Sequence, residues 1–273
     1  MWGIRVVTTA LSELTSLLSL IGVLVLSGLV SFTAGRAVHA DVIELRAGHW
    51  CPYVCRSDTS HPGLLIELTR EALAPFGHEI RYETLSWSRS LTLVHTGAVN
   101  GLLGPEMYKI SGLTFTQPIT HHQEALAFRR GEARPVQVLQ ALQDLQLGAV
   151  QDYRYSNRLA QYIAENRNRP SRVQLINGGD TVARNLKKLL NHRVDLVLEA
   201  QAVLVHRARQ LGLSDLIDIQ SYSMPQAIRL GFSPALPSSA RYVQQFNAGL
   251  AQLKHSGRYH EILVRYGQAG ALQ

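Results

Sequence analysis

Two cysteines stand close together near the start of the chain and could form a disulfide bond. Cys51 and Cys55 are the only cysteines in 273 residues, too few for a disulfide-rich scaffold or a four-cysteine zinc site. Their spacing permits a disulfide where the two Cα atoms come within ~7 Å of each other. A redox or metal pair with His49 is the alternative, although the sequence has no Cys-x-x-Cys motif. In an oxidising compartment we expect a disulfide that braces the loop carrying Trp50.

A second group of polar and aromatic residues, 151–155, precedes a predicted helix. Backbone N–H groups and the helix dipole at such a position favour an anion. Arg154 would add positive charge, and Tyr153 or Tyr155 would add a flat surface for stacking. The alternative is a surface turn whose tyrosines pack locally. We therefore treat these three residues as candidate ligand contacts.

The histidines do not form a metal-binding pattern. His121 and His122 are adjacent, so their side chains would diverge in a strand, and His49, His61 and His78 lack the spacing of metal ligands. The sequence also has no Gly-x-Ser-x-Gly element, phosphate-binding loop or His-Glu-x-x-His helix. We expect no metal, no cofactor and no catalytic residues.

The first 40 residues have the order of a secretory signal peptide. Residues 1–5 are basic, no charged residue lies between Glu13 and Arg36, and the stretch 17–30 is almost wholly apolar. Small residues follow, which predicts an exported, periplasmic protein cleaved after Ala40. An uncleaved membrane anchor is the alternative, because the uncharged run approaches the ~20 residues that span a bilayer.

The positive charge of the chain does not indicate a nucleic-acid partner. The sequence has 27 Lys and Arg against 20 Asp and Glu, a formal net charge of +7. Removal of the signal peptide leaves +6 on an exported body, which meets no cytoplasmic nucleic acid. The basic residues also lie in different segments, which favours a solvated surface. The main basic segments are 129–130, 167–172, 187–188 and 207–209.

The elements that must position these residues alternate between strands and helices. Hydrophobic periodicity predicts strands at 42–47, 80–85, 99–103, 124–128, 147–150, 173–176, 194–198 and 227–232. It predicts helices at 63–76, 88–96, 136–144, 155–166, 181–191, 202–212, 243–253 and 259–266. This alternation predicts an α/β protein with largely parallel sheets. Turns near 129–135 and 221–225 divide it into two units, and a cleft between the units is a common ligand site.

The order of short motifs resembles the bacterial solute-binding protein family 3, periplasmic proteins that present polar amino acids to ABC transporters. The resemblance covers roughly residues 42–267. The matching segments are Trp50-Cys51-Pro52-Tyr53, Gly63–Leu68, Trp87-Ser88-Arg89, Phe115–Ile119, Gly148–Tyr153, Arg193-Val194-Asp195 and Leu253–Tyr259. The resemblance implies a type II periplasmic binding protein fold with flanking helices and two hinge crossings. Lobe 1 would be 41–126 plus 227–273, and lobe 2 would be 127–226.

The resemblance also implies an aromatic wall after the first strand, formed by Trp50 and Tyr53. Flat aromatic side chains bury area and can face a cation. At the start of the second helix, Trp87 and Arg89 would face the cleft, where a guanidinium can form a two-pronged bond with an anion. Core filling is the alternative for the two wall residues, and a tie between helix and loop is the alternative for Arg89.

Amino-acid-binding members of the family hold the ligand carboxylate with an arginine shortly before the Phe-Thr/Ser-x-Pro segment, and the ammonium with an aspartate after the Arg-Val-Asp strand. Here the arginine position, counted back from Phe115, falls on Lys109, and the nearest acid beyond Asp195 is Glu199. A lysine counters a carboxylate as a point charge without bidentate geometry. The candidate ligand contacts in these two segments are Gly104, Glu106, Lys109 and Glu199.

From the resemblance we expect a binding protein that closes on a small polar solute, an amino acid or related compound, for an ABC transporter or a sensor. We expect a monomer without nucleic acid. An enzyme on the same scaffold, of the cyclohexadienyl dehydratase type with Glu199 as general acid, is one alternative. A membrane-tethered sensory module is another. The positions of Arg89, Lys109 and Arg154 suggest a ligand with an anionic group.

Overall fold

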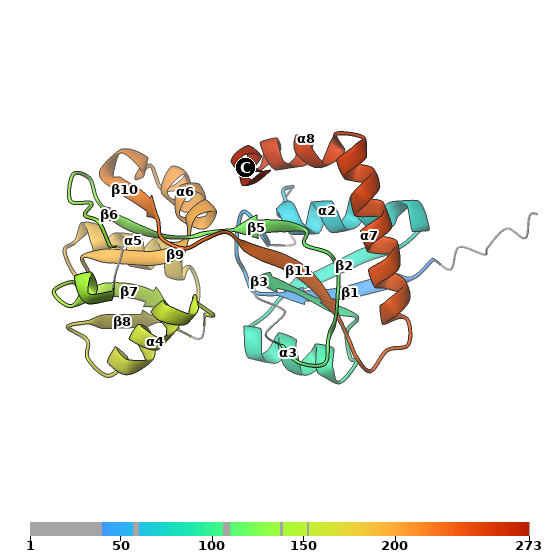
Figure 1. Ribbon diagram of the computed structural model, residues 1–273, viewed down its shortest axis with the longest axis horizontal. Coiled ribbons are helices and arrows are strands. Elements are labelled where there is room, and N and C mark those ends of the chain that lie inside the picture. Colours follow the sequence, from blue (N-terminus) through green and yellow to red (C-terminus); the bar gives the residue numbers. More distant parts are fainter. Residues whose placement is uncertain (1–39, 57–59, 106–109, 137–138, 152, 273) are drawn as a thin grey trace, which may run out of the picture. The chain divides into compact units, whose positions relative to one another are not determined.

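The structure is a computed structural model that describes residues 40–56, 60–105, 110–136, 139–151 and 153–272 (Figure 1). The predicted signal segment 1–40 lies outside this range except for Ala40, so its cleavage stays a prediction. Glu106 and Lys109, two of the candidate ligand contacts, also lie outside the described residues. Within the described ranges, no helix has the length and apolar character needed to cross a membrane.

Six strands form the first sheet, in the order β2-β1-β3-β11-β4, with β5 also paired to β11. β1 is parallel to β2 and β3, whereas β11 is antiparallel to β3, β4 and β5. The strands are β1 (Val42–Ala47), β2 (Glu79–Thr84), β3 (Gly101–Pro105), β4 (Thr114–Phe115), β5 (Thr120–His122) and β11 (Gln226–Phe232).

Five strands form the second sheet, in the order β10-β6-β9-β7-β8. β7 is parallel to β8 and β9, whereas β6 is antiparallel to β9 and β10. The strands are β6 (Glu124–Arg129), β7 (Leu147–Val150), β8 (Val173–Ile176), β9 (Leu196–Ala200) and β10 (Ile217–Ser221). The chain therefore crosses between the sheets twice, once between β5 and β6 and once between β10 and β11 (Figure 1).

Helices flank both sheets. Those that accompany the first sheet are α2 (Leu64–Leu73), α3 (Trp87–His95), α7 (Ser239–His255) and α8 (Arg258–Arg265). Those that accompany the second sheet are α4 (Asn157–Asn166), α5 (Thr181–Leu190) and α6 (Gln201–Gln210). α2 and α7 pack so closely that a Cβ atom added to Gly249 would lie 1.8 Å from the Ala72 carbonyl oxygen. Only glycine fits at this crossing.

The alternation of side chains along β9 explains how the second sheet is covered on both faces. Leu196 and Leu198 belong to the buried cluster that contains Leu159 of α4. Val197, between them, belongs to the cluster that contains Leu186 of α5 and Leu204 of α6. α4 therefore covers one face of this sheet, and α5 and α6 cover the other.

The predicted α/β class is confirmed, but each sheet is mixed rather than largely parallel. The antiparallel pairs arise where strands lie next to a crossing, because β6 and β11 each enter a sheet from the other one. The helix predicted at 136–144 is also shorter than expected: the described part has a 3-10 turn at Leu139–Leu142. The Leu145 N–H donates to the Leu142 carbonyl at 3.1 Å, which ends the turn.

Candidate functional site

The loop after β1 is held by the predicted disulfide, which the structure confirms. The Cα atoms of Cys51 and Cys55 lie 4.5 Å apart, and the two sulfurs are bonded. The loop also packs onto the start of α2, where the backbone at Gly63 has φ 109° and a Cβ atom would lie 2.5 Å from the Tyr53 carbonyl oxygen. The position of the loop is therefore fixed by the bond within it and by the glycine next to it.

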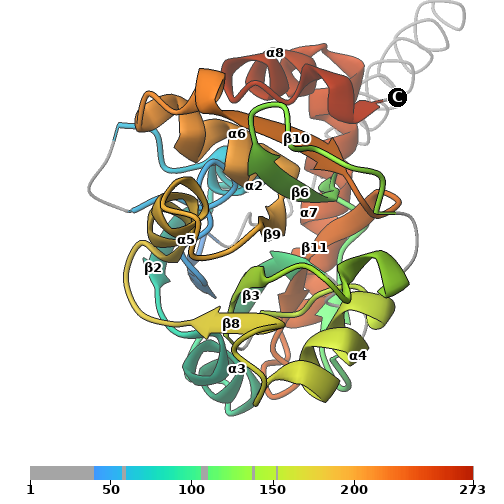
Figure 2. The same ribbon diagram turned by 90° about the vertical axis from the view of Figure 1, so that its left-hand side faces the viewer.

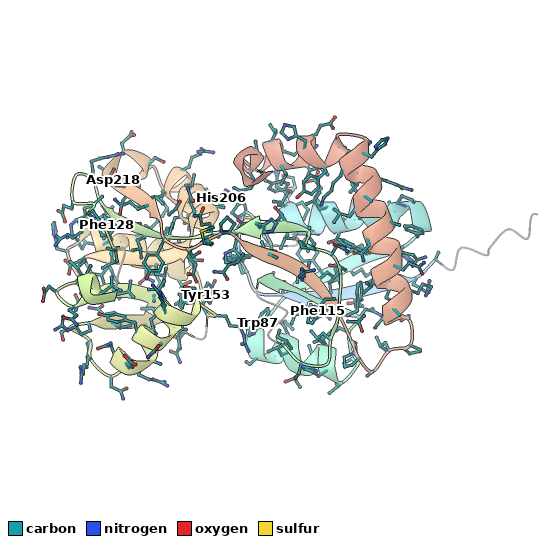
Figure 3. The ribbon with its side chains drawn as sticks, in the orientation of Figure 1. Trp87, Phe115, Phe128, Tyr153, His206 and Asp218 are labelled. Atoms are coloured by element: carbon teal, nitrogen blue, oxygen red, sulfur yellow. A yellow bond between two sulfur atoms is a disulfide. The ribbon has the colours of Figure 1, made fainter. Side chains whose placement is uncertain are left out.

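Trp50, at the start of this loop, makes contacts with both sheets. Its indole N–H donates a hydrogen bond to Glu199 Oε1 at 3.2 Å, across a sequence separation of 149 residues. Its ring stacks on Tyr53, with centroids 4.3 Å apart, and meets the His122 ring edge-on at 5.2 Å. Cys51 is also close to the second sheet, with its sulfur 3.4 Å from His206 Nε2 of α6 (Figure 3). The loop thus joins the first sheet to β9 and α6.

Glu199 is a buried carboxyl group at the C-terminal end of β9. It is 2% exposed, and its Oε1 also accepts the Ala200 N–H at 2.8 Å. Its Oε2 is buried and has no hydrogen-bond partner among the described residues. Burial raises the pKa of Glu199 to about 7, with a further contribution from Glu124, and the bonds from Ala200 and Trp50 oppose the shift. The group is therefore close to half-protonated at neutral pH.

Two further buried polar residues belong to this region, and neither is among the ligand contacts expected from the sequence. Glu124 opens β6, is 3% exposed and accepts the Ser156 N–H at 2.6 Å, just before α4. His122 ends β5; both its ring nitrogens are buried without a hydrogen-bond partner in the described part of the chain. Burial, with a smaller effect of His121, lowers the pKa of His122 to about 4, so the ring is neutral at pH 7. Both residues lie where the chain crosses from β5 in the first sheet to β6 in the second.

The tyrosines after β7 lie within electrostatic range of Glu199. Tyr155 is buried, and its hydroxyl oxygen accepts the Val150 N–H at 2.8 Å. The ring of Tyr153 lies 6.1 Å from that of Tyr155 and is 36% exposed (Figure 3). Burial, and then the charge of Glu199, raises the pKa of Tyr155. One of them is thus a packed support, and the other offers an accessible ring.

Arg154 lines a separate hollow beside α3. It is exposed and lines a hollow of about 500 Å³ together with residues of α3 and the segment that follows β3. The other lining residues are Leu91, Thr92, His95, Thr96, Ile110 and Ser111. The hollow is therefore lined by α3, Thr96 and residues 110–111 on the side of the first sheet, and by Arg154 from the loop before α4.

The remaining candidates lie in the first sheet and its helices. Trp87, the first residue of α3, packs against a small buried cluster that includes Val94 and Leu102. Arg89 is exposed on the same helix, and Gly104 is buried in β3 opposite Arg229. Within the described residues, no hydrogen bond, ion pair or ring contact joins these candidates to Glu199. The structure thus groups Trp50, Tyr53, Tyr153, Tyr155 and Glu199, and shows no such contact for Trp87, Arg89, Gly104 and Arg154.

The side chains around Glu199 determine which interactions this region can make with a ligand. The pKa of Glu199 is set by its burial, two donated hydrogen bonds and Glu124; no cationic side chain of the described chain is among the causes. A carboxyl near half-protonation, a neutral imidazole and aromatic faces can accept hydrogen bonds from a polar solute and cover its apolar part. Among the described residues, no group of three or more His, Cys, Asp and Glu side chains could hold a metal ion.

Comparisons with known proteins show the fold. No protein-family model matches the chain, and no curated protein sequence matches it significantly. Among solved structures, a histidine kinase sensor domain with similarity to periplasmic binding proteins has 21% identity and a TM-score of 0.66, over 82% of this chain and 95% of that one. An ABC uptake transporter substrate-binding protein from Streptococcus pneumoniae with bound histidine has 15% identity and a TM-score of 0.67, over 85% and 95%. Another from the same species, bound to L-arginine, has 13% identity and a TM-score of 0.63, over 84% and 96%. The chain therefore has the fold of the periplasmic binding proteins, as the motif order predicts.

Proposed function

We propose that this chain is an exported, periplasmic solute-binding protein that closes on a small polar solute and presents it to an ABC transporter or a sensor. The observation that carries the proposal is the hydrogen bond from Trp50 to Glu199. The bond joins the loop after β1, in the first sheet, to the C-terminal end of β9, in the second sheet, beside both crossings. A solute held at this place would contact both halves of the fold and would couple its binding to their closure.

The charges suggest how a solute would be oriented. Glu199 and Glu124 supply carboxyl groups at the crossing, and Arg154 supplies a cation at the hollow beside α3. A solute with a hydrogen-bond donor at one end and an anionic group at the other, such as an amino acid or a related compound, would engage both where closure of the two halves brings the hollow next to Glu199. Arg89 and Lys109 are further candidates for the anionic end, and Trp50 and Tyr153 for the flat walls.

Thermal unfolding of residues 41–273, dialysed free of small molecules, tests the proposal. The panel contains amino acids, amines and small organic acids. At a concentration a hundredfold above its Kd, a solute that binds only the native state adds about 2.7 kcal/mol of stability, a clear rise in Tm. The R154Q variant should lose the rise, whereas R134Q, which removes an exposed arginine in the loop after β6, should keep it. A panel without any stabilising compound would count against the function.

The state of the N-terminal segment decides between a free carrier and a tethered sensory module. We propose cleavage after Ala40, which gives a free protein for a transporter. The similarity of the fold to a histidine kinase sensor domain favours a sensory role if the segment stays attached. N-terminal sequencing of the exported protein separates the two: a start at Asp41 supports the carrier, and retention of residues 1–40 supports the tethered module.

An enzyme on the same scaffold is the second candidate, favoured by one observation. Glu199 is buried with a pKa of about 7, the range in which a carboxyl can serve as a general acid. The reaction to test is the loss of water from prephenate or arogenate. Turnover that E199Q abolishes would support the enzyme, and binding of solutes without turnover would support the carrier.

A further inference from the structure

The segment from Arg154, before α4, to Arg193, before β9, carries an excess of positive charge. From Arg154 to Arg193 the sequence has nine Lys and Arg but two Asp and Glu. None of these nine makes an ion pair in the part of the chain that the structure describes, whereas Arg129, Arg130 and Arg207 all do. Asp180, one of the two acids, is bound by Arg207 of α6. The charge of this segment is therefore not compensated within it.

The topology brings six of these basic residues to one end of the second sheet. α4 ends just before β8, and α5 ends just before β9, so both connections lie where the parallel strands β7, β8 and β9 begin. α4, β8 and α5 can be followed in Figure 2. We call this set the basic end; its members are Arg167, Arg169, Arg172, Lys187, Lys188 and Arg193.

Backbone and side-chain contacts tie the two connections together. The Gln174 side chain in β8 donates to the Arg193 carbonyl at 2.9 Å, and the Arg193 N–H donates to the Lys188 carbonyl at 2.8 Å. The Leu147 N–H of β7 donates to the Arg172 carbonyl, also at 2.8 Å. Residues that are distant in sequence are thus held at one place by the fold.

The six cations of the basic end outnumber the three acids next to it in the sequence, Asp144, Glu165 and Asp195. Burial lowers the pKa of Lys188, and the neighbouring cations Arg184 and Arg193 lower it further, as expected for like charges held close together. Asp195, which directly precedes β9, is bound by Arg129 at 3.5 Å and accepts the Gln146 N–H. The field at this end is therefore positive, and a partner with negative charge would gain from contact with it.

The composition of the surface favours a protein partner over a lipid surface. The large apolar side chains that are exposed in the described chain are Val42, Tyr153, Val205, Leu216, Met224 and Val264. None belongs to the basic end, whereas surfaces that insert into membranes carry apolar anchors. Arginine predominates over lysine there, and its planar group forms paired hydrogen bonds with carboxylates. We propose that the basic end is a docking surface for an acidic patch on a partner protein.

The proposed docking surface and the solute site lie at opposite ends of the strands in the second sheet. Glu199 lies at the C-terminal end of β9 and Tyr153 follows that of β7, whereas the basic end lies where these strands begin. Docking therefore leaves the solute site accessible. Substitutions in the basic end should change the interaction with an acidic partner and leave solute binding unchanged, so the two proposals fail independently.

The test compares two variants with the same loss of charge. The docking variant replaces four exposed residues of the basic end: R167Q, R169Q, K187Q and R193Q. The control variant replaces four exposed basic residues elsewhere that form no ion pair within the described chain: R134Q, R158Q, R209Q and K254Q. The probes are a fluorescein-labelled peptide of alternating glutamate and serine, and phosphatidylcholine vesicles with and without phosphatidylglycerol.

We expect the natural protein to bind the acidic peptide, with an affinity that falls as salt is added. The docking variant should lose about tenfold in affinity, and the control variant should stay within about twofold of the natural protein. Equal losses in the two variants would show an effect of net charge and overturn the proposal. Binding to anionic vesicles without binding to the peptide would also overturn it, in favour of a lipid surface.

Discussion

Glu199 makes a specific prediction about how stability depends on pH. A free glutamate has a pKa of 4.5, and burial raises that of Glu199 to about 7 in the folded chain. Between these two values the native state binds more protons at this position than the unfolded state does. The free energy of unfolding therefore falls as pH rises through this window, and it stays lower above it.

The size of the effect follows from the shift. Integrated between about pH 5 and pH 8, a carboxyl with these two pKa values lowers the free energy of unfolding by roughly 2 to 3 kcal/mol. Glu199→Gln removes the titrating group and keeps an oxygen that can accept the Trp50 indole N–H. The variant should lose this part of the pH dependence, even if its amide group destabilises the protein by a constant amount.

Urea unfolding of residues 41–273 at several pH values measures the effect. The informative quantity is the difference in free energy of unfolding between the natural protein and E199Q, because all other titrating groups cancel in it. Relative to E199Q, the natural protein should become less stable by about 2 to 3 kcal/mol from pH 5 to pH 8. A difference that stays constant across this range, or one that changes in the opposite direction, would refute the reasoning.

Three other perturbations test neighbouring features. The pKa of His122 is lowered, so the natural protein should gain roughly 3 kcal/mol relative to H122F as pH rises from about 4 to 6.5, the opposite sign to Glu199; a flat difference in urea unfolding would contradict this. The double variant C51S/C55S should lose about 2 kcal/mol of stability, the entropy of closing so short a loop; thermal unfolding that matches the natural protein would show that the loop is held by its other contacts. G249A should lose more than about 3 kcal/mol or fail to fold, because its new Cβ would overlap a backbone oxygen of α2, whereas G48A has open space and should be near neutral; equal unfolding midpoints for the two would contradict the close packing.

Much of the fold could be predicted from the sequence because its signals are local. The period of apolar residues predicts a helix at 181–191, and α5 occupies Thr181–Leu190. The strand predicted at 147–150 is β7. The two-residue strand β4 and the short strands β5 and β10 next to the crossings are not among the predicted strands. Their pairing depends on partners far along the chain, and no periodicity within two to five residues can indicate it.

In the candidate site, too, the local features could be predicted from the sequence and the long-range contacts could not. The motif order places Trp50 and Glu199 among the candidates, but their hydrogen bond joins residues 149 positions apart and required the structure. Glu124 had no signal beyond its place at the start of an apolar strand. The basic segments 167–172 and 187–188 are separate in the sequence, and only the topology of β7, β8 and β9 brings them together.

A fluorescence titration of Trp50 tests the central claim, that one solute binds where the two sheets meet. Trp50 and Trp87 are the tryptophans of residues 41–273, so the W87F variant leaves Trp50 as the only indole reporter. Titration with the solute that stabilises the protein should give a saturable change in emission with one solute per chain, because binding would alter the surroundings of the indole and its bond to Glu199. A solute that binds by calorimetry but leaves the Trp50 emission unchanged would contradict the account.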